Sequence, residues 1–76
     1  MDIREVFARN LRKIRQARRL SQEALAHEAG IDRTYISALE RCVYSASIDT
    51  VDKLAAALDV EPADLLQKSS VRSRKG

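Results

Sequence analysis

Residues 21–41 constrain the fold of this chain most strongly, and they run S-Q-E-A-L-A-H-E-A-G-I-D-R-T-Y-I-S-A-L-E-R. The first part carries apolar residues at the helical period, namely Leu25, Ala26 and Ala29. Gly30 can end this helix because glycine adopts the left-handed conformation without a Cβ penalty. Ser21 and Asp32 are good N-caps, one ahead of each helix. The segment therefore predicts two short helices joined by a tight turn, which is a helix-turn-helix.

The second of these helices has two distinct faces. Its apolar stripe consists of Tyr35, Ile36 and Leu39. The other positions are small, polar or basic, and they are Arg33, Thr34, Ser37 and Ala38. A face of this kind suits insertion into a DNA major groove, which is about 12 Å wide. Arg33 can also donate two hydrogen bonds to one guanine.

A longer amphipathic helix is predicted ahead of this segment, over residues 3–18. Its apolar residues recur at the helical period and are Ile3, Val6, Phe7, Leu11, Ile14 and Ala17. Its other faces carry the cations Arg4, Arg9, Arg12, Lys13, Arg15 and Arg18. These cations can form an ordinary solvated face. Those from Arg15 to Arg19 lead into the turn before Ser21 and can also reach phosphates.

Two more helices are predicted after residue 41. The segment C-V-Y-S-A-S lacks a helical period and ends in Ser47, an N-cap for a helix over residues 48–58. Pro62 suits the first position of a fifth helix, over residues 62–68. No stretch alternates as a strand would, so the sequence predicts an all-α domain of five helices.

Charge is unevenly distributed along the chain, whose net charge is +3. Residues 1–41 carry nine Arg and Lys against six Asp and Glu, and residues 42–68 carry two against five. The domain is predicted to span residues 1–68, and the basic tail 69–76 is expected to be disordered. The basic half favours a polyanionic partner, and the acidic segment favours a protein contact. Ordinary surface charge is the alternative explanation.

Other classes of function lack their sequence features. The chain has one cysteine, Cys42, and one histidine, His27, which argues against a disulfide or a metal site, and no cofactor is expected. Cys42 is more simply explained as a small hydrophobe than as a redox switch. No stretch approaches the ~20 apolar residues of a membrane span, and no signal-peptide core is present, so we expect a cytoplasmic protein. Without a Cys–His pair or a glycine-rich phosphate loop, we expect no enzyme.

Four segments resemble the lambda-repressor-like helix-turn-helix family, also called the XRE or Cro/C1 type. They are L-S-Q-E-A-L-A, A-G-I-D-R-T-Y-I-S-A-L-E-R, S-I-D-T-V-D-K-L-A-A-A-L-D-V and P-A-D-L-L, within residues 6–66. The segment D-R-T-Y-I-S, followed by L-E-R, further resembles a subgroup that includes restriction–modification controller proteins and small stand-alone regulators. The resemblance implies a compact five-helix DNA-binding domain.

The resemblance also implies roles for particular residues, because the family lays its third helix, here residues 33–41, in the major groove. The positions that match base-reading residues are Arg33, Thr34, Ser37 and Ala38. Those expected at the DNA backbone or the edge of the site are Ser21, Gln22, Arg15, Arg19, Arg41 and Tyr44. The amides at the start of the second helix suit a phosphate independently of the family. Tyr44 can equally be a partly packed surface aromatic.

Arg15 and Glu40 match a pair that links the first helix of the family to the end of the third, and Gln22 matches a residue that braces this helix. Glycine is frequent in the family where this chain has Arg19, Cys42 and Asp59, and proline is frequent in place of Ala46. The residue at position 19 predicts a less tight turn. The residue at position 42 argues against a left-handed end to the third helix.

These features predict a sequence-specific regulator of transcription that binds double-stranded DNA as a homodimer, because one recognition helix reads too few base pairs for useful selectivity. A two-fold dimer predicts a near-palindromic operator with half-sites about 34 Å apart. The predicted dimer interface comprises Val60, Pro62, Leu65 and Leu66, with Ile48 and Val51 as further candidates. One alternative is an antitoxin-like or adaptor protein that holds another protein through residues 42–68. A second is an architectural DNA-binding role without sequence preference.

Overall fold

The computed structural model describes residues 2–68, and within them it contains five helices and no strand. They are α1 (Ile3–Ala17), α2 (Gln22–Ala29), α3 (Arg33–Glu40), α4 (Ile48–Leu58) and α5 (Pro62–Leu66). The prediction of an all-α fold with five helices is therefore confirmed. The predicted disordered tail, residues 69–76, lies outside the described residues. None of the helices described here is long and apolar enough to cross a membrane.

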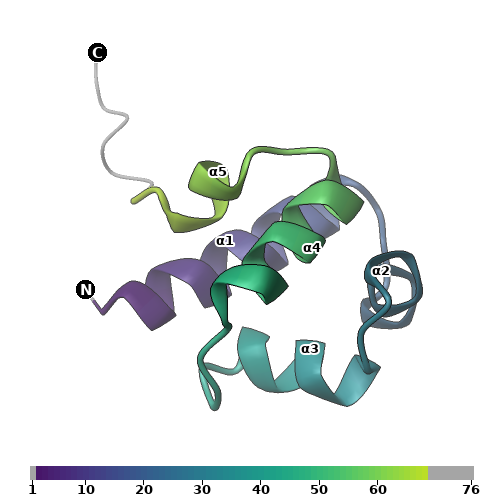
Figure 1. The fold of residues 1–76 in the computed structure, drawn as a ribbon, viewed down its shortest axis with the longest axis horizontal. Helices are drawn as coiled ribbons and strands as arrows, with labels where there is room; N and C mark the ends of the chain where they lie inside the picture. Colours follow the sequence, from purple (N-terminus) through teal and green to yellow (C-terminus); the bar gives the residue numbers. More distant parts are fainter. Residues whose placement is uncertain (1, 69–76) are drawn as a thin grey trace.

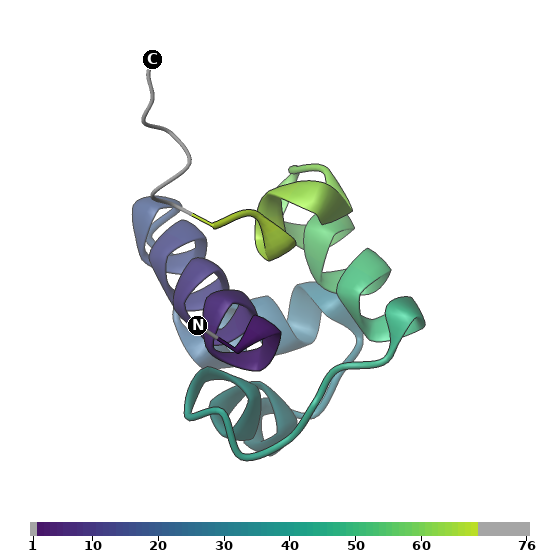
Figure 2. The same ribbon diagram turned by 90° about the vertical axis from the view of Figure 1, so that its left-hand side faces the viewer.

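The helices form a small cluster in which α3 and α5 lie on opposite sides. Figure 1 shows α1 and α4 through the middle of the molecule, with α5 above them and α3 below. The view turned by 90° keeps α3 at the bottom and α5 at the top (Figure 2). Helix α3 packs on α1 and α2, and α5 packs on α1 and α4. The outer side of α3 is therefore left uncovered by the rest of the domain.

The core draws at least one fully buried side chain from every helix. The largest are Leu11, Leu25, Ile36, Leu39, Leu54, Leu58 and Leu65. Burial of an aliphatic side chain of this size stabilises the fold by about 1.5–3 kcal/mol. Because the five helices share one core, their positions relative to each other are fixed together.

Side chains cap the N-termini of the first four helices. The backbone N–H groups of Arg4, Ala24, Thr34 and Thr50 donate to Asp2, Ser21, Asp32 and Ser47 respectively, at 2.8–3.1 Å. The three N-caps predicted from the sequence, at positions 21, 32 and 47, are confirmed. At α1, the hydrogen bond from the Arg4 amide lowers the pKa of the Asp2 carboxyl.

The C-termini of these four helices share one motif, although only one of them has a glycine there. The residues with positive φ are Arg19 at 59°, Gly30 at 69°, Cys42 at 63° and Asp59 at 59°. At the end of α3, the Cys42 amide donates to the Leu39 carbonyl at 3.1 Å, and the Val43 amide donates to the Ala38 carbonyl at 2.9 Å. This pair of bonds is a Schellman motif. The expectations of a less tight turn at position 19 and of no left-handed end at position 42 are therefore wrong.

Helix α5 is held to α1 by a buried amide. The Asn10 side chain is almost fully buried, and its Nδ2 donates to the carbonyls of Leu65 at 3.0 Å and Gln67 at 2.7 Å. These two bonds satisfy carbonyl groups that the end of a helix leaves unpaired. The chain turns extended at Gln67, so α5 ends at Leu66 and is shorter than the predicted 62–68.

Candidate nucleic-acid interface

The first turn of α3 presents polar side chains to solvent. Arg33 and Thr34 are exposed, and Ser37 is half-buried. The stripe of the helix that faces inward is buried, with Ile36 fully covered and Leu39 nearly so. Hydrogen-bonding groups therefore line the outer side of a helix whose other side is anchored in the core.

Ala38 does not belong to this outer side. Its side chain is only 3% exposed, so a base cannot reach its methyl group, and its assignment as a base-reading residue was wrong. The physical reason is the close packing of α3 on α1 and α2, which covers the last turns of α3. A small side chain at this position permits that close packing.

The last turn of α3 is tied to α1 and α2 through one carboxylate. The Glu40 side chain is 1% exposed and accepts hydrogen bonds from Arg15 Nε at 2.6 Å to Oε2 and from Arg15 Nη2 at 3.0 Å to Oε1. Gln22 Nε2 donates to the same Oε1 at 3.1 Å. A two-point Arg–carboxylate contact fixes direction as well as distance. The predicted Arg15–Glu40 pair and the bracing contact of Gln22 are both present.

Arg15 is almost fully engaged within the protein. Besides Glu40, its guanidinium donates from Nη1 to the Leu20 carbonyl at 2.8 Å, and 12% of its side chain is exposed. It therefore joins α1, the turn before α2 and the end of α3. This arrangement makes Arg15 a positioning residue, and its predicted contact with the DNA backbone stays a prediction.

Three other residues predicted to contact the DNA backbone lie at or next to helix ends. Arg19, Ser21 and Arg41 are exposed, at the end of α1, the start of α2 and the end of α3 respectively. The Ser21 hydroxyl oxygen already accepts the Ala24 amide. Arg41 Nε lies 3.4 Å from the Ser37 carbonyl, which is a weak contact on the same helix. The DNA-backbone contacts expected of these residues stay predictions.

Tyr44 lies in the loop between α3 and α4 and contacts Tyr35. The two ring centroids are 6.2 Å apart, and the Tyr35 hydroxyl donates to the Ser45 carbonyl at 3.3 Å. The Tyr44 side chain also lines a small hollow, together with Ile3 and Leu66. Tyr44 therefore packs partly against Tyr35 while 58% of it remains exposed, and its predicted phosphate contact stays a prediction.

A second exposed region lies on α4 and α5, and we call it the apolar surface. A groove of about 370 Å³ there is lined by Ile48, Val51, Pro62 and Leu66, with the acidic residues Asp49 and Asp52 at its side. Ile48 is 88% exposed and Leu66 is 41% exposed. Leu65, however, is fully buried in the core, because α5 docks by this side chain, so it cannot supply a dimer interface as predicted. Val60 is half-buried against the core.

Comparison with known proteins identifies the family of this chain. Residues 11–65 match the family model described as helix-turn-helix. A hypothetical transcription factor of Neisseria meningitidis is 45% identical over 65 residues, which is 86% of this chain and 61% of the relative. The control protein C.BamHI of Bacillus amyloliquefaciens is 41% identical over 71 residues, which is 92% of this chain and 88% of that protein.

Solved structures agree with the sequence comparison. The crystal structure of the Neisseria factor NHTF superposes with a TM-score of 0.90 at 42% identity, over 93% of this chain and 82% of that chain. The restriction–modification controller protein C.Esp1396I, solved as a tetramer on its natural 35 base-pair operator, superposes with a TM-score of 0.79 at 28% identity, over 86% of each chain. With its family match, its relatives and its five helices in agreement, this chain belongs to the helix-turn-helix family, and within it resembles the restriction–modification controller proteins.

Proposed function

We propose that this protein is a sequence-specific DNA-binding regulator of transcription that acts as a homodimer. The observation that carries the proposal is the division of α3, whose first turn exposes Arg33 and Thr34 while its last turn is fixed through Glu40. Base edges in the major groove are read by side chains on a helix held in one orientation. In this proposal Arg33 donates to guanine, and Thr34 and Ser37 meet neighbouring base edges.

The DNA backbone would be held on both sides of this helix. The N-terminus of α2, at Ser21 and Gln22, offers backbone amides of the kind that bind phosphate. Arg19 and Arg41 supply exposed guanidinium groups near the two ends of the site. Such contacts set the register of the protein on the duplex but carry no sequence information.

The apolar surface is the part of the domain that we propose for the dimer contact. The exposed side chains of an isoleucine and a leucine line one groove together with a proline, and adjoining exposed apolar residues are a common feature of interfaces. It lies on α4 and α5, away from α3, so a second copy docked there leaves both recognition helices free (Figure 1). The operator-bound oligomer of C.Esp1396I supports an oligomeric regulator.

Selection of binding sites from a random duplex pool tests the DNA-binding proposal. We expect an enriched near-palindrome whose half-site centres lie about 34 Å apart, which is one turn of DNA. Binding with no enrichment of any sequence would overturn sequence-specific recognition and would support the architectural role.

Sedimentation equilibrium tests the dimer contact. Ile48→Ser removes an apolar side chain that is 88% exposed, so it should weaken the dimer without unfolding the domain. Val43→Ser is the matched control, because Val43 is 54% exposed but lines neither apolar hollow. Equal dimer dissociation constants for the two variants would show that the apolar surface is not the interface.

A further inference from the structure

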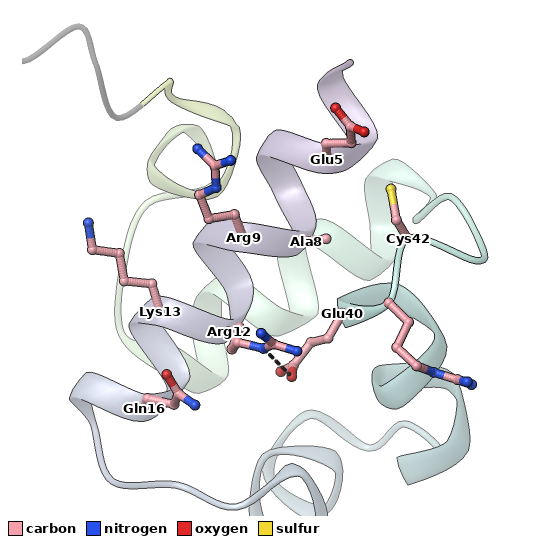
Figure 3. Close-up of a pocket in the computed structure, with 9 residues that line it drawn as sticks. Glu5, Ala8, Arg9, Arg12, Lys13, Gln16, Glu40 and Cys42 are labelled. Carbon is pink, nitrogen blue, oxygen red and sulfur yellow. Dashed lines mark ion pairs between the residues drawn. The ribbon is translucent and has the colours of Figure 1, made fainter. Parts of the chain in front are cut away.

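A basic groove runs between α1 and the end of α3, on a side of the domain that the proposed base-reading residues do not occupy. It has a volume of about 420 Å³ and is lined on α1 by Arg9, Arg12, Lys13 and Gln16. The end of α3 contributes Glu40 and Arg41 to the other wall, followed by Cys42. Figure 3 shows Arg9, Lys13 and Gln16 on successive turns along one side of the view, with Cys42 across from them.

Positive charge dominates this groove. Its four cations are Arg9, Arg12, Lys13 and Arg41, and its two acids are Glu5 and Glu40. The Glu40 carboxylate is already engaged by Arg15 and Gln22, so it neutralises little of this charge. Among residues 2–68, neither Arg9 nor Lys13 forms an ion pair. Clustered cations without partners within the described chain favour an anionic ligand.

The groove is continuous with the recognition helix. Arg12 Nε lies 3.9 Å from Glu40 Oε1, and 58% of the Arg12 side chain remains exposed (Figure 3). Arg41, which follows the last residue of α3, forms part of the same wall. A duplex that holds α3 in its major groove presents a phosphate backbone on each flank of that helix. The groove adjoins the end of α3, so the phosphate backbone on that flank is the one that it would contact.

We propose that the basic groove binds the phosphate backbone of the DNA that flanks the base-reading site. Arg12 and Arg41 meet the phosphates nearest the recognition helix, and Arg9 and Lys13 extend the contact along α1. The proposal rests on the proposed function in one respect, since it requires duplex DNA against α3. DNA already bound there supplies the anion, so no further partner is needed.

The test is the salt dependence of DNA affinity for the variant Arg9→Gln/Lys13→Gln. Each phosphate contact contributes about −0.9 to the slope of log K against log salt. On a 40 base-pair duplex we expect this variant to lose up to about 2 units of that slope relative to the wild type. The matched control is Lys53→Gln/Lys68→Gln, which removes the same charge from exposed positions outside the groove and should keep the wild-type slope.

A second duplex, trimmed to the enriched site, locates the contact. The wild-type slope should be steeper on the long duplex than on the trimmed one, and the groove variant should lose this difference. Equal slopes for the groove variant and the control would overturn the proposal. Repeating the measurement on a random duplex separates the groove proposal from the proposed function. If the groove variant has a smaller slope but no sequence is enriched, the groove binds phosphate and sequence-specific regulation is contradicted. If a sequence is enriched but the slope of the groove variant is unchanged, sequence-specific binding is supported and the groove proposal is contradicted.

Discussion

The two ends of α3 differ in almost every physical respect, although the helix is only eight residues long. At the start, the side chains of Arg33 and Thr34 are exposed, and the Thr34 amide donates to the Asp32 N-cap. At the end, Glu40 is buried and accepts three hydrogen bonds from α1 and α2. One short helix thus exposes polar side chains at its start and is fixed to the rest of the domain at its end. In the proposed function, the first part contacts the bases and the second part sets the orientation of the helix.

The two ends of α3 should also differ in how much a substitution changes the free energy of unfolding. Changes at exposed positions away from special features usually alter stability by less than about 0.5 kcal/mol. Removal of one partner from a buried ion pair is far more costly, because the other charge stays in a poorly solvated site. Substitutions at the two ends of α3 should therefore produce opposite patterns of stability and affinity.

The largest effect is expected from Glu40→Ala. It leaves the Arg15 guanidinium, whose side chain is 12% exposed, without its carboxylate. We expect a loss of about 3 kcal/mol in the free energy of unfolding, which would lower Tm by roughly 15 °C, measured by thermal denaturation. Glu23→Ala removes the same charge from an exposed position of α2 and should change Tm little. A similar Tm for both variants would show that the carboxylate does not fix α3.

A double-mutant cycle with Arg15→Ala identifies the pair as the cause. If Arg15 and Glu40 act together, the two changes should be strongly non-additive in DNA affinity as well as in stability. Additive losses of affinity would remove the orienting role of the pair, whatever the effect on Tm.

Arg33→Ala should show the reverse pattern, with unchanged stability and reduced selectivity. Losing a bidentate contact to guanine costs about 1–3 kcal/mol of discrimination, so affinity for the enriched site should fall towards that for random DNA. Arg4→Ala is the control, since it removes an exposed arginine from the first turn of α1. Competition binding measures the ratio of the affinity for the enriched site to the affinity for random DNA. An equal loss of affinity for the two duplexes would refute base reading by Arg33.

The smallest effect concerns where α3 stops. A non-glycine residue in the left-handed conformation costs about 1–2 kcal/mol, and part of this is recovered when glycine replaces it. We expect Cys42→Gly to raise stability by about 1 kcal/mol in denaturant unfolding, and Asp59→Gly to raise it less, because aspartate tolerates this conformation. Cys42→Ala keeps the Cβ and should give no gain. If Cys42→Ala were as stable as Cys42→Gly, the stability gain would come from removal of the thiol and not from relief of the backbone conformation.

Much of the fold could be predicted because local signals agreed with each other. The N-caps at Ser21, Asp32 and Ser47 lie directly ahead of helices whose apolar periods were clear, and the bounds of α4 were predicted without error. The end of α5 was predicted two residues too late. The side-chain hydrogen bonds that its end receives come from Asn10, which is distant in sequence. A contact across the whole fold leaves no local signal.

The misassigned site residues failed for a related reason. Ala38 and Leu65 are compatible with two environments each, since a small residue fits a helix contact or a base, and a leucine fits a core or an interface. Only the packing of α3 against its neighbours and of α5 against α1 and α4 decides between them. At Cys42, the preference for glycine was weaker than the two backbone hydrogen bonds that close α3. Arg12, which lies beside Glu40, could have been found from its spacing to Arg15 on one face of α1.

In the proposed dimer, the buried amide of Asn10 has a consequence for the length of the operator. Its hydrogen bonds hold the end of α5 on both sides of Leu66, and α1, which carries Asn10, also carries Arg15, which contacts the end of α3. In the proposed dimer, the distance between two recognition helices depends on the angle between these two attachments. In the proposed dimer, α1 would thus determine the number of base pairs between the two half-sites without itself reading the bases.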